Sequence, residues 1–157
     1  MDTIRLEPDF DRYDELLALI LAAFACMDGR IDPPSSARAL TVEALRQKVS
    51  DEIAFAAVRG GELLGCVFLK PEPECLYVGK LAVAPASQRR GIGRHLIDIA
   101  EQTARNLSLP ALRLQTRIEL AENHAIFGAW GFVEAGRSAH PGFTRPTSIE
   151  MKKVIVL

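Results

Sequence analysis

The stretch "LAVAPASQRRGIGRHLI" most limits what this chain can fold into, because it joins an apolar strand to a helix through a glycine turn. Gly91 and Gly93 stand among arginines at the point where the helix is expected to begin. The first N–H groups of a helix have no partner within it, and with the helix dipole they form a site for an anion. We therefore expect an anion site here. A tight turn with solvated arginines is the alternative interpretation.

Two well-known phosphate loops are excluded at this turn. A Walker A loop needs Lys-Ser or Lys-Thr after its glycines, and neither dipeptide follows here. The dinucleotide fingerprint needs a third glycine at position 96, where this chain has Leu96. The turn also lies past the middle of the chain, after strands that look antiparallel, which is the wrong place for a first mononucleotide-binding unit.

The hydrophobic pattern of the whole chain predicts an α/β fold in the approximate order βααβββαβαββ. We expect a central mixed, mostly antiparallel sheet flanked by helices. The strand at 75–85 is apolar on both faces, which is typical of the middle of a sheet. Helices are predicted at 9–25, 37–50, 93–107 and 120–130, and strands at 3–7, in 52–70 as a hairpin, and at 75–85, 111–116, 132–137 and 148–156. On the third helix Glu101 and Arg105 have the spacing of a surface ion pair.

Composition narrows the class of protein. The 157 residues carry a formal net charge of -1 and are 48% hydrophobic, which is ordinary for a globular protein. Such a chain has no overall positive field to attract nucleic acid, and its basic turn lacks interleaved aromatic residues, so we expect no nucleic-acid partner. The longest apolar run, "LLALILAAFAC", is too short to cross a membrane.

The three cysteines form no CxxC pair, and one would be left over under any pairing. The first residues carry no signal-peptide pattern. We therefore expect reduced thiols in a cytoplasmic protein, with the cysteines acting as small packing residues. No spacing among histidines, cysteines and acidic residues indicates a metal site.

The glycine turn closely resembles motif A of the GCN5-related N-acetyltransferases, whose signature is [RQ]-x-x-G-x-[GA] after a central strand. Gln88, Gly91 and Gly93 match it residue by residue. Downstream, "LRLQTRIELAENHAIFGAWGF" is similar to the family's later strand–helix–Gly-Phe segment, which ends here at Gly131-Phe132. Together with the element order, the resemblance covers nearly the whole chain and implies one acetyltransferase domain over residues 1–157.

The resemblance implies that acetyl-CoA binds where two strands, here 76–84 and 112–116, splay apart. Main-chain groups near Leu81 and Val83 would pair with the pantetheine amides, as an added strand would. The pyrophosphate would lie on the N–H groups of the turn, and Asn123 and Phe127 would lie beside the cofactor. The implied cofactor-binding residues are Leu81, Val83, Gln88, Arg89, Arg90, Gly91, Ile92, Gly93, Arg94, Asn123 and Phe127.

The chain departs from the family pattern where the acid and base would stand. The family often has a tyrosine proton donor at the position of Phe127, which has no proton to give, and an asparagine at the position of Leu120. Some members carry a glutamate base where this chain has Tyr77, whose phenol would orient water or donate a proton; an aromatic packed in a central strand is the alternative. Water, or a thiolate stabilised by the helix end, would replace the missing acid. We interpret Glu72 and Glu74, between prolines, as solvated loop charges.

Two loops are expected to meet the acceptor. The first offers Asp28, Arg30 and Asp32, and the second offers His140 and Arg145. The carboxylates would attract an amine and the arginines would hold an acceptor carboxylate, which fits an amino acid or a peptide end; solvated loops are the alternative. His140 is the second candidate for catalysis, beside Tyr77. The two other histidines, on helices, are expected to be structural or exposed.

The sequence thus predicts an N-acetyltransferase that moves an acetyl group from acetyl-CoA to a primary amine of a small molecule or peptide by direct attack. A non-catalytic acyl-CoA-binding sensor or regulatory module is the alternative, because the usual tyrosine is missing. We expect no membrane partner, and a homodimer is open.

Overall fold

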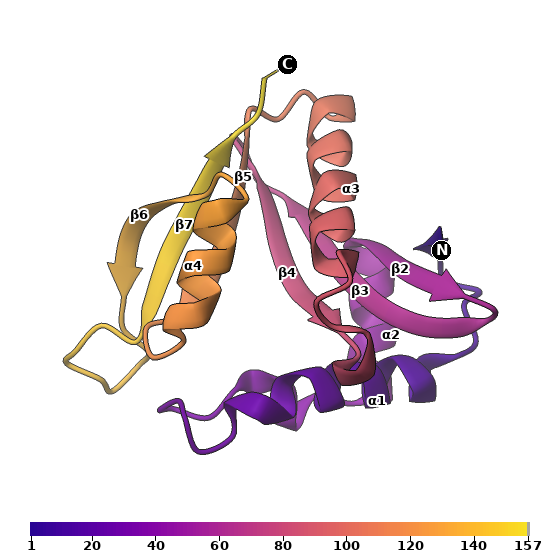
Figure 1. Ribbon diagram of the computed structural model, residues 1–157, viewed down its shortest axis with the longest axis horizontal. Coiled ribbons are helices and arrows are strands. Elements are labelled where there is room, and N and C mark those ends of the chain that lie inside the picture. The colour runs from indigo at the N-terminus through magenta and orange to yellow at the C-terminus, as the bar shows by residue number, and fades with distance from the viewer. Residues whose placement is uncertain (157) are drawn as a thin grey trace.

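A mixed sheet of seven strands forms the body of the protein, whose computed structural model describes residues 1–156 (Figure 1). Across the sheet the strands follow the order β1-β2-β3-β4-β5-β7-β6. Among the described neighbours, β4 and β5 alone run parallel. The strands are β1 (Asp2–Leu6), β2 (Ile53–Arg59), β3 (Glu62–Pro71), β4 (Leu76–Val83), β5 (Ala111–Arg117), β6 (Val133–Ser138) and β7 (Ser148–Val154). The predicted fold class and element order are confirmed.

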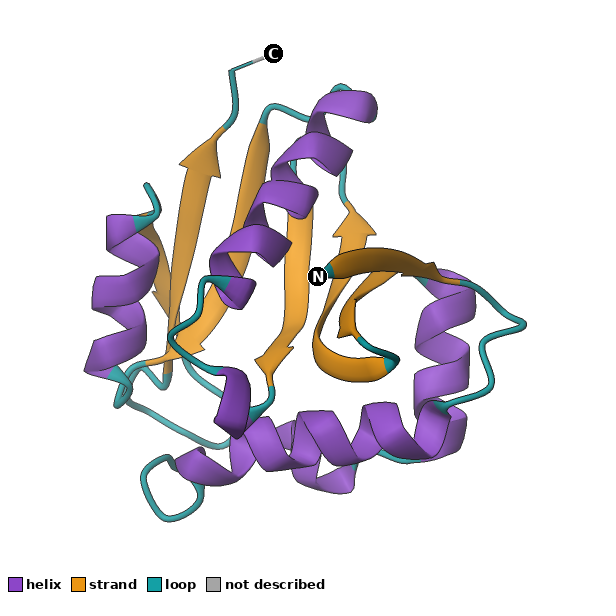
Figure 2. Ribbon diagram, turned by 45° about the vertical axis from the view of Figure 1, so that its right-hand side comes forward, coloured by secondary structure: helices purple, strands orange, loops and turns teal. Residues whose placement is uncertain are grey.

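Helices cover both faces of the sheet and divide the core in two (Figure 2). On one face α3 buries Leu96, Ile97 and Ala100 against the strands. On the other face α1 and α2 bury a second cluster that includes Leu16 and Leu45. The spacing of these apolar residues gives each helix one buried side, which is what holds it on the sheet. The helices are α1 (Tyr13–Phe24), α2 (Val42–Asp51), α3 (Ile92–Asn106) and α4 (Ala121–Ala129).

The second predicted helix is shorter than its hydrophobic pattern indicates. Helix α2 begins at Val42, and the segment Ser36–Ala39 forms a separate 3-10 turn. The Thr41 hydroxyl accepts a hydrogen bond from the Ala44 N–H at 3.1 Å and so caps α2. A cap at this position starts a new helix rather than continuing the preceding turn.

The sheet opens between its two middle strands. β4 and β5 pair at two positions, Leu76 with Leu112 and Tyr77 with Arg113. Beyond these pairs the two strands diverge, as Figure 1 shows by the widening gap between β4 and β5. Both strands are held on their outer sides by long antiparallel ladders to β3 and β7. The sheet therefore behaves as two halves joined at one end.

A bulge lies in β4 on the side that opens. The pairing with β3 shifts register between Cys66 and Phe68, because Cys66 faces Ala82 while Phe68 faces Gly79. The additional β4 residue is accommodated at Lys80, whose φ of 46° lies in the left-handed region. A lysine is uncommon in that conformation.

An ion-pair cluster, here called the Arg113 network, consists of Arg113, Glu72, Glu150 and Tyr77. Arg113 donates from Nε and from Nη2 to the two Glu72 carboxylate oxygens, each at 2.9 Å, and pairs with Glu150 through Nη1. Its guanidinium lies 4.4 Å from the centre of the Tyr77 ring. The interpretation of Glu72 as a solvated charge is wrong, because this carboxylate links the turn before β4 to β5.

A buried ion pair between α3 and β7 replaces the surface pair expected on α3. Glu101 is 8% exposed and pairs with Lys153 of β7. Arg105 instead donates to the carbonyl oxygen of Val156 at 3.3 Å. Burial of a carboxylate requires a partner, and the partner here comes from the sheet rather than from the same helix.

We expect Glu72→Gln to lower the free energy of unfolding by about 1–3 kcal/mol at neutral pH, since a hydrogen-bonded charge is lost. Arg113 lowers the pKa of Glu72 in the folded state, chiefly by hydrogen bonding. The stabilisation is therefore complete above the ordinary glutamate pKa of 4.5 and is lost as pH falls through the lower, folded pKa. Urea unfolding of both proteins from pH 7 to pH 3 checks this.

Glu74→Gln is the matched control, because Glu74 is exposed in the same turn. Its stability should equal that of the wild type at every pH. Equal losses for the two variants would contradict a special role for Glu72.

Candidate active site

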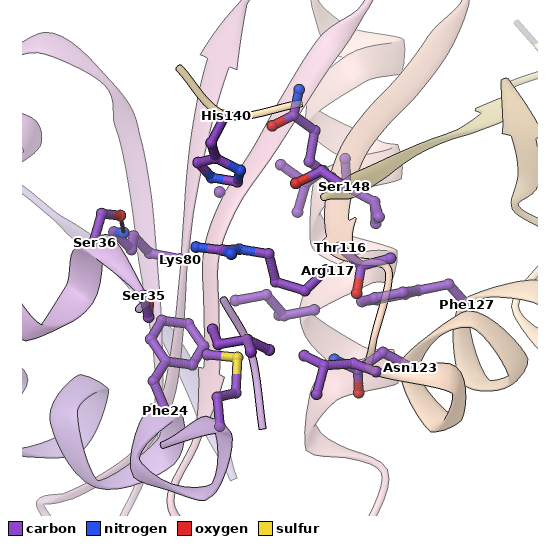
Figure 3. A pocket seen from close by; sticks show the side chains of 18 of the residues that line it. Phe24, Ser35, Ser36, Lys80, Thr116, Arg117, Asn123, Phe127, His140 and Ser148 are labelled. Atoms are coloured by element: carbon purple, nitrogen blue, oxygen red, sulfur yellow. Dashed lines mark hydrogen bonds between the residues drawn. The ribbon is translucent and has the colours of Figure 1, made fainter. Parts of the chain in front are cut away.

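A cavity of about 320 Å³ lies where β4 and β5 diverge. Figure 3 shows Ser36 and Lys80 on one side of it, Phe127, Asn123 and Thr116 on the other, and His140 at its edge. The lining comes from the segment between α1 and α2, from both diverging strands, from α4, and from the segment that leads into β7. The opening predicted from the family resemblance is thus a real space with side chains of several elements around it.

The glycine turn presents free N–H groups at the start of α3. Gly91 precedes the helix with φ 81° and no side chain caps this end. Arg89 also has a positive φ, 65°. Backbone in this conformation directs successive N–H groups to one side, which suits an anion.

The two glycines of the turn are needed for different reasons. A Cβ on Gly91 would meet no atom within 4 Å, so its requirement is the left-handed backbone. A Cβ on Gly93 would lie 3.2 Å from the Trp130 ring, so its requirement is close packing of α3 on the segment after α4. Gly91 therefore allows the conformation of the turn, and Gly93 allows α3 to pack closely on the segment after α4.

The side chains of the turn divide into engaged and free ones. Arg94 donates to the Trp130 carbonyl oxygen at 3.2 Å and pairs with Asp98 at 3.3 Å. Gln88 donates to the Val83 carbonyl oxygen at 3.2 Å, so this oxygen already has one partner. Arg89 and Arg90 are exposed, and no ion pair joins either to another described residue.

Phe127 stands at the position of the family's tyrosine and belongs to an apolar cluster. Its ring packs edge-on against Trp130 and Phe132, with centroids 5.7 and 5.9 Å away. Both Phe127 and Asn123 line the cavity, as expected for residues beside a cofactor, and so does Leu81 of β4. Val83 lies outside the lining.

Thr116 is a cavity residue that the sequence analysis missed. It is 7% exposed, and its Oγ1 is buried without a hydrogen-bond partner among the described residues. An unpaired buried hydroxyl is costly unless a ligand or water completes it. Alternation in β5 indicates that Thr116 shares a face with Leu114, but no sequence signal predicts that this face opens onto a cavity.

Tyr77 lines the cavity at the joined end of the strands. Burial is the main cause that raises its pKa above the ordinary value of 10, which keeps the phenol neutral at neutral pH. Its ring packs under Arg113. The phenol of Tyr77 therefore keeps its proton at neutral pH, where it can donate a hydrogen bond but is a poor base.

His140 faces the cavity with one ring nitrogen free. Its backbone N–H donates to Thr147 Oγ1 at 2.9 Å, and Nδ1 bonds to the same hydroxyl oxygen. Thr147 donates its own proton to the Ser138 carbonyl oxygen at 3.4 Å. A hydroxyl has one proton, so when Thr147 gives it to Ser138 the hydrogen of the ring lies on Nδ1 and Nε2 keeps its lone pair. Burial, and then the Arg117 charge, lower the pKa of His140 below 6.5.

The charged residues predicted to bind the acceptor pair with one another or with neighbours outside the cavity lining. Arg30 pairs with Glu122, Arg145 with Asp32 at 3.3 Å, and Asp28 lies 3.9 Å from Arg38. These exposed pairs tie the loop after α1 to α4 and to the loop before β7. The two loops lie together as expected, but their charged side chains are paired within the protein instead of lining the cavity.

The two helical histidines are structural, as expected. His95 bonds to the Thr3 hydroxyl at 2.7 Å, and His124 bonds to the Arg117 carbonyl oxygen at 2.9 Å.

Lys80 and Arg117 are the cations that the structure places on the cavity lining and that sequence reasoning missed. Arg117 donates to the carbonyl oxygens of Pro33 and Pro34 at 2.7 and 3.2 Å, which fixes the loop after α1. Lys80 lies at the bulge. A lysine within an otherwise apolar strand was the available signal.

Within residues 1–156 no group of three or more histidines, cysteines and acids is arranged to hold a metal ion. No helix in that range is long and apolar enough to cross a membrane. Cys66 and Cys75 are buried free thiols, as expected of small packing residues, whereas Cys26 is an exposed thiol, so that expectation is wrong for Cys26.

Comparison with known proteins identifies the class. Residues 17–132 match the model of the acetyltransferase (GNAT) family. The chain is 30% identical over 128 residues to an IAA acetyltransferase of Azospirillum brasilense, covering 80% of this chain and 81% of that protein. It is 37% identical over 89 residues to a mycothiol acetyltransferase of Jonesia denitrificans, covering 54% of this chain but only 27% of that longer protein.

The fold is also similar to that of a solved protein. The PaiA N-acetyltransferase from Thermoplasma acidophilum, determined in complex with coenzyme A, superposes with a TM-score of 0.78 at 16% identity, over 98% of this chain and 99% of that one. The chain belongs to the GNAT family of acetyltransferases, which confirms the resemblance seen in its sequence. Acetyl-CoA is the donor that this membership implies, and a non-catalytic binding module is not favoured.

Proposed function

We propose that this protein transfers the acetyl group of acetyl-CoA to a primary amine of a small molecule or peptide by direct attack. The observation that carries the proposal is the cavity between β4 and β5, which has α4 on one side and His140 with the loop after α1 on the other. Donor and acceptor would enter it from these two sides. The acceptor class and a homodimer remain predictions, as does a cytoplasmic location.

The residues at the start of α3 fit the anionic part of coenzyme A. Free N–H groups from Arg89 to Arg94, a left-handed Gly91 and two unpaired arginines would hold the pyrophosphate. Leu81 on the opened edge of β4 would offer main-chain groups to the pantetheine arm, with Asn123 and Phe127 on its other side. Acetyl-CoA supplies an activated acetyl thioester to this site.

Arg90→Ala should weaken coenzyme A binding about 5-fold, the effect of an exposed ion pair, and Arg90→Glu should weaken it further by placing a like charge beside the phosphates. Isothermal titration with coenzyme A at low salt measures both. Arg59→Glu is the control, since Arg59 is an exposed arginine of the β2–β3 hairpin, outside the glycine turn. Equal affinities for the Arg90 variants would count against a phosphate site at this turn.

His140 is the base that the geometry supports. Its Nε2 lone pair is oriented by the Thr147 hydrogen bond, and its lowered pKa keeps it neutral at neutral pH. It would take a proton from the acceptor ammonium before the attack, because only the neutral amine has a lone pair; the proton that the attacking nitrogen then loses would pass through water to the leaving thiolate. Tyr77, with its raised pKa, cannot act this way at neutral pH.

We expect kcat/KM to fall as the pH drops through the pKa of His140, which lies below 6.5, because the protonated ring has no lone pair. His140→Gln should lower kcat about 100-fold and remove this acid limb. His95→Gln is the control, because His95 bonds to Thr3, a residue far from it in the sequence. This variant should keep the wild-type kcat and the acid limb. An acid limb that survives in His140→Gln would exclude His140 as the base.

The leaving thiolate needs a hydrogen-bond donor, and Phe127 has none. Thr116 offers a buried hydroxyl with no partner in the same cavity. A threonine hydroxyl is too weak an acid to give up its proton, so we propose that it donates a hydrogen bond to the sulfur while water supplies the proton.

Thr116→Val, which keeps the shape of the side chain, should lower kcat about 10-fold with little change in KM for acetyl-CoA. It should also reduce the ratio of affinities for coenzyme A and its desulfo analogue, measured by calorimetry. Thr103→Val is the control, because Thr103 bonds to its own helix at Ile99. An unchanged kcat and an unchanged ratio would together exclude Thr116.

A further inference from the structure

The charged groups on the cavity lining all have the same sign. Its side chains include Lys80 and Arg117, with the titratable ring of His140, and no aspartate or glutamate from the described residues. Carboxylates such as Asp32 and Glu119 lie near Arg117, but outside the lining. An acceptor inside this cavity therefore meets a positive potential.

Arg117 is partly occupied by the protein itself. It holds the carbonyl oxygens of Pro33 and Pro34, so its first role is to fix the loop after α1. Its charge still contributes to the field in the cavity, since it lowers the pKa of the neighbouring His140.

Lys80 has no such role. Its ammonium has one side-chain partner among the described residues, the Ser36 hydroxyl at 3.4 Å, and no carboxylate within 4.0 Å. The nearby Lys48 is itself paired with Glu52 at 2.7 Å. Burial lowers the pKa of Lys80, which reflects the cost of holding this charge away from water without a partner. Ser36 belongs to the loop after α1, across the cavity from α4.

The backbone at Lys80 is also unusual. It is one of three non-glycine residues with positive φ in the described chain, and it lies at the bulge of β4. A glycine would adopt this conformation without strain. Strained backbone at a cavity points to function when the side chain it presents has no structural partner.

We infer that Lys80 binds a carboxylate of the acceptor, so that the substrate is an amine that also carries a carboxylate. This inference rests on the proposed acetyl transfer and names its substrate class. One ammonium with one adjacent hydroxyl matches the single charge of a carboxylate, whereas a phosphate needs more donors. Polyamines and other polycations are disfavoured, because they would bring further positive charge to Lys80 and Arg117. The carboxylate lies at Lys80 rather than at Arg30 or Arg145, whose charges are already paired.

The test uses products without an amine, so that binding reports the anion alone. Acetylated glycine, alanine and phenylalanine are titrated, each as the free acid and as the carboxamide, into the protein with coenzyme A present. In the wild type at least one acid should bind about 10- to 100-fold more tightly than its amide.

Lys80→Met should bring this ratio close to 1, because methionine has a similar length and the same backbone strain but no charge. Lys80→Gly, which fits the positive φ, should also lose the preference while remaining folded. Lys70→Met, an exposed lysine of the adjacent strand, is the matched control and should keep the wild-type ratio.

Three outcomes would overturn the inference: equal binding of acids and amides by the wild type, a preference that survives in Lys80→Met, or acetylation of Lys80 itself by acetyl-CoA alone, seen by mass spectrometry. Failure of the proposed function has a different signature, since a wild-type protein that binds no coenzyme A would sink the acetyltransferase assignment whatever Lys80 does.

Discussion

The two residue pairs that join β4 to β5 are the constraint on which the rest of the site depends. A parallel contact this short is weak by itself, and the Arg113 network reinforces it by linking Glu72 before β4, Arg113 on β5 and Glu150 on β7. The network joins the two halves at one end and leaves the other end free to open. With more residue pairs, β4 and β5 would stay hydrogen-bonded along their length, and no cavity would form between them.

The opening then determines which side chains line the cavity. Thr116, Lys80 and Arg117 would be ordinary sheet residues if the strands remained paired, and instead they line a cavity. The bulge adds a second constraint, because the additional residue in β4 turns the backbone at Lys80. Helix α3 completes the arrangement with a free N-terminus at the glycine turn. One irregular region of the sheet would thus provide both the proposed donor site and the proposed acceptor site.

The sequence predicted the elements that depend on local pattern. Apolar spacing located the helices and strands, and the glycine turn identified the start of α3 and the family. The sequence failed to predict the features that depend on contacts between segments far apart in the chain. Glu72 and Glu101 looked like surface charges, because their partners, Arg113 and Lys153, lie 41 and 52 positions further along the chain. Lys80 stood out as a charge in an apolar strand and Thr116 carried no signal; the role of neither could be predicted, since neither the bulge nor the opening can be seen in the pattern of one strand.

The positive cavity also bears on the chemistry of transfer. An amine attacks only when it is neutral, and an ammonium ion close to Lys80 and Arg117 loses its proton more readily because neighbouring like charges lower its pKa. Burial, and then the Arg117 charge, lower the pKa of His140 as well, which leaves its ring unprotonated at neutral pH and able to accept that proton. A carboxylate on the acceptor would offset part of the repulsion and hold the molecule in place while its amino group remains in the positive field. Recognition of the acceptor and activation of its amine would then draw on one set of charges.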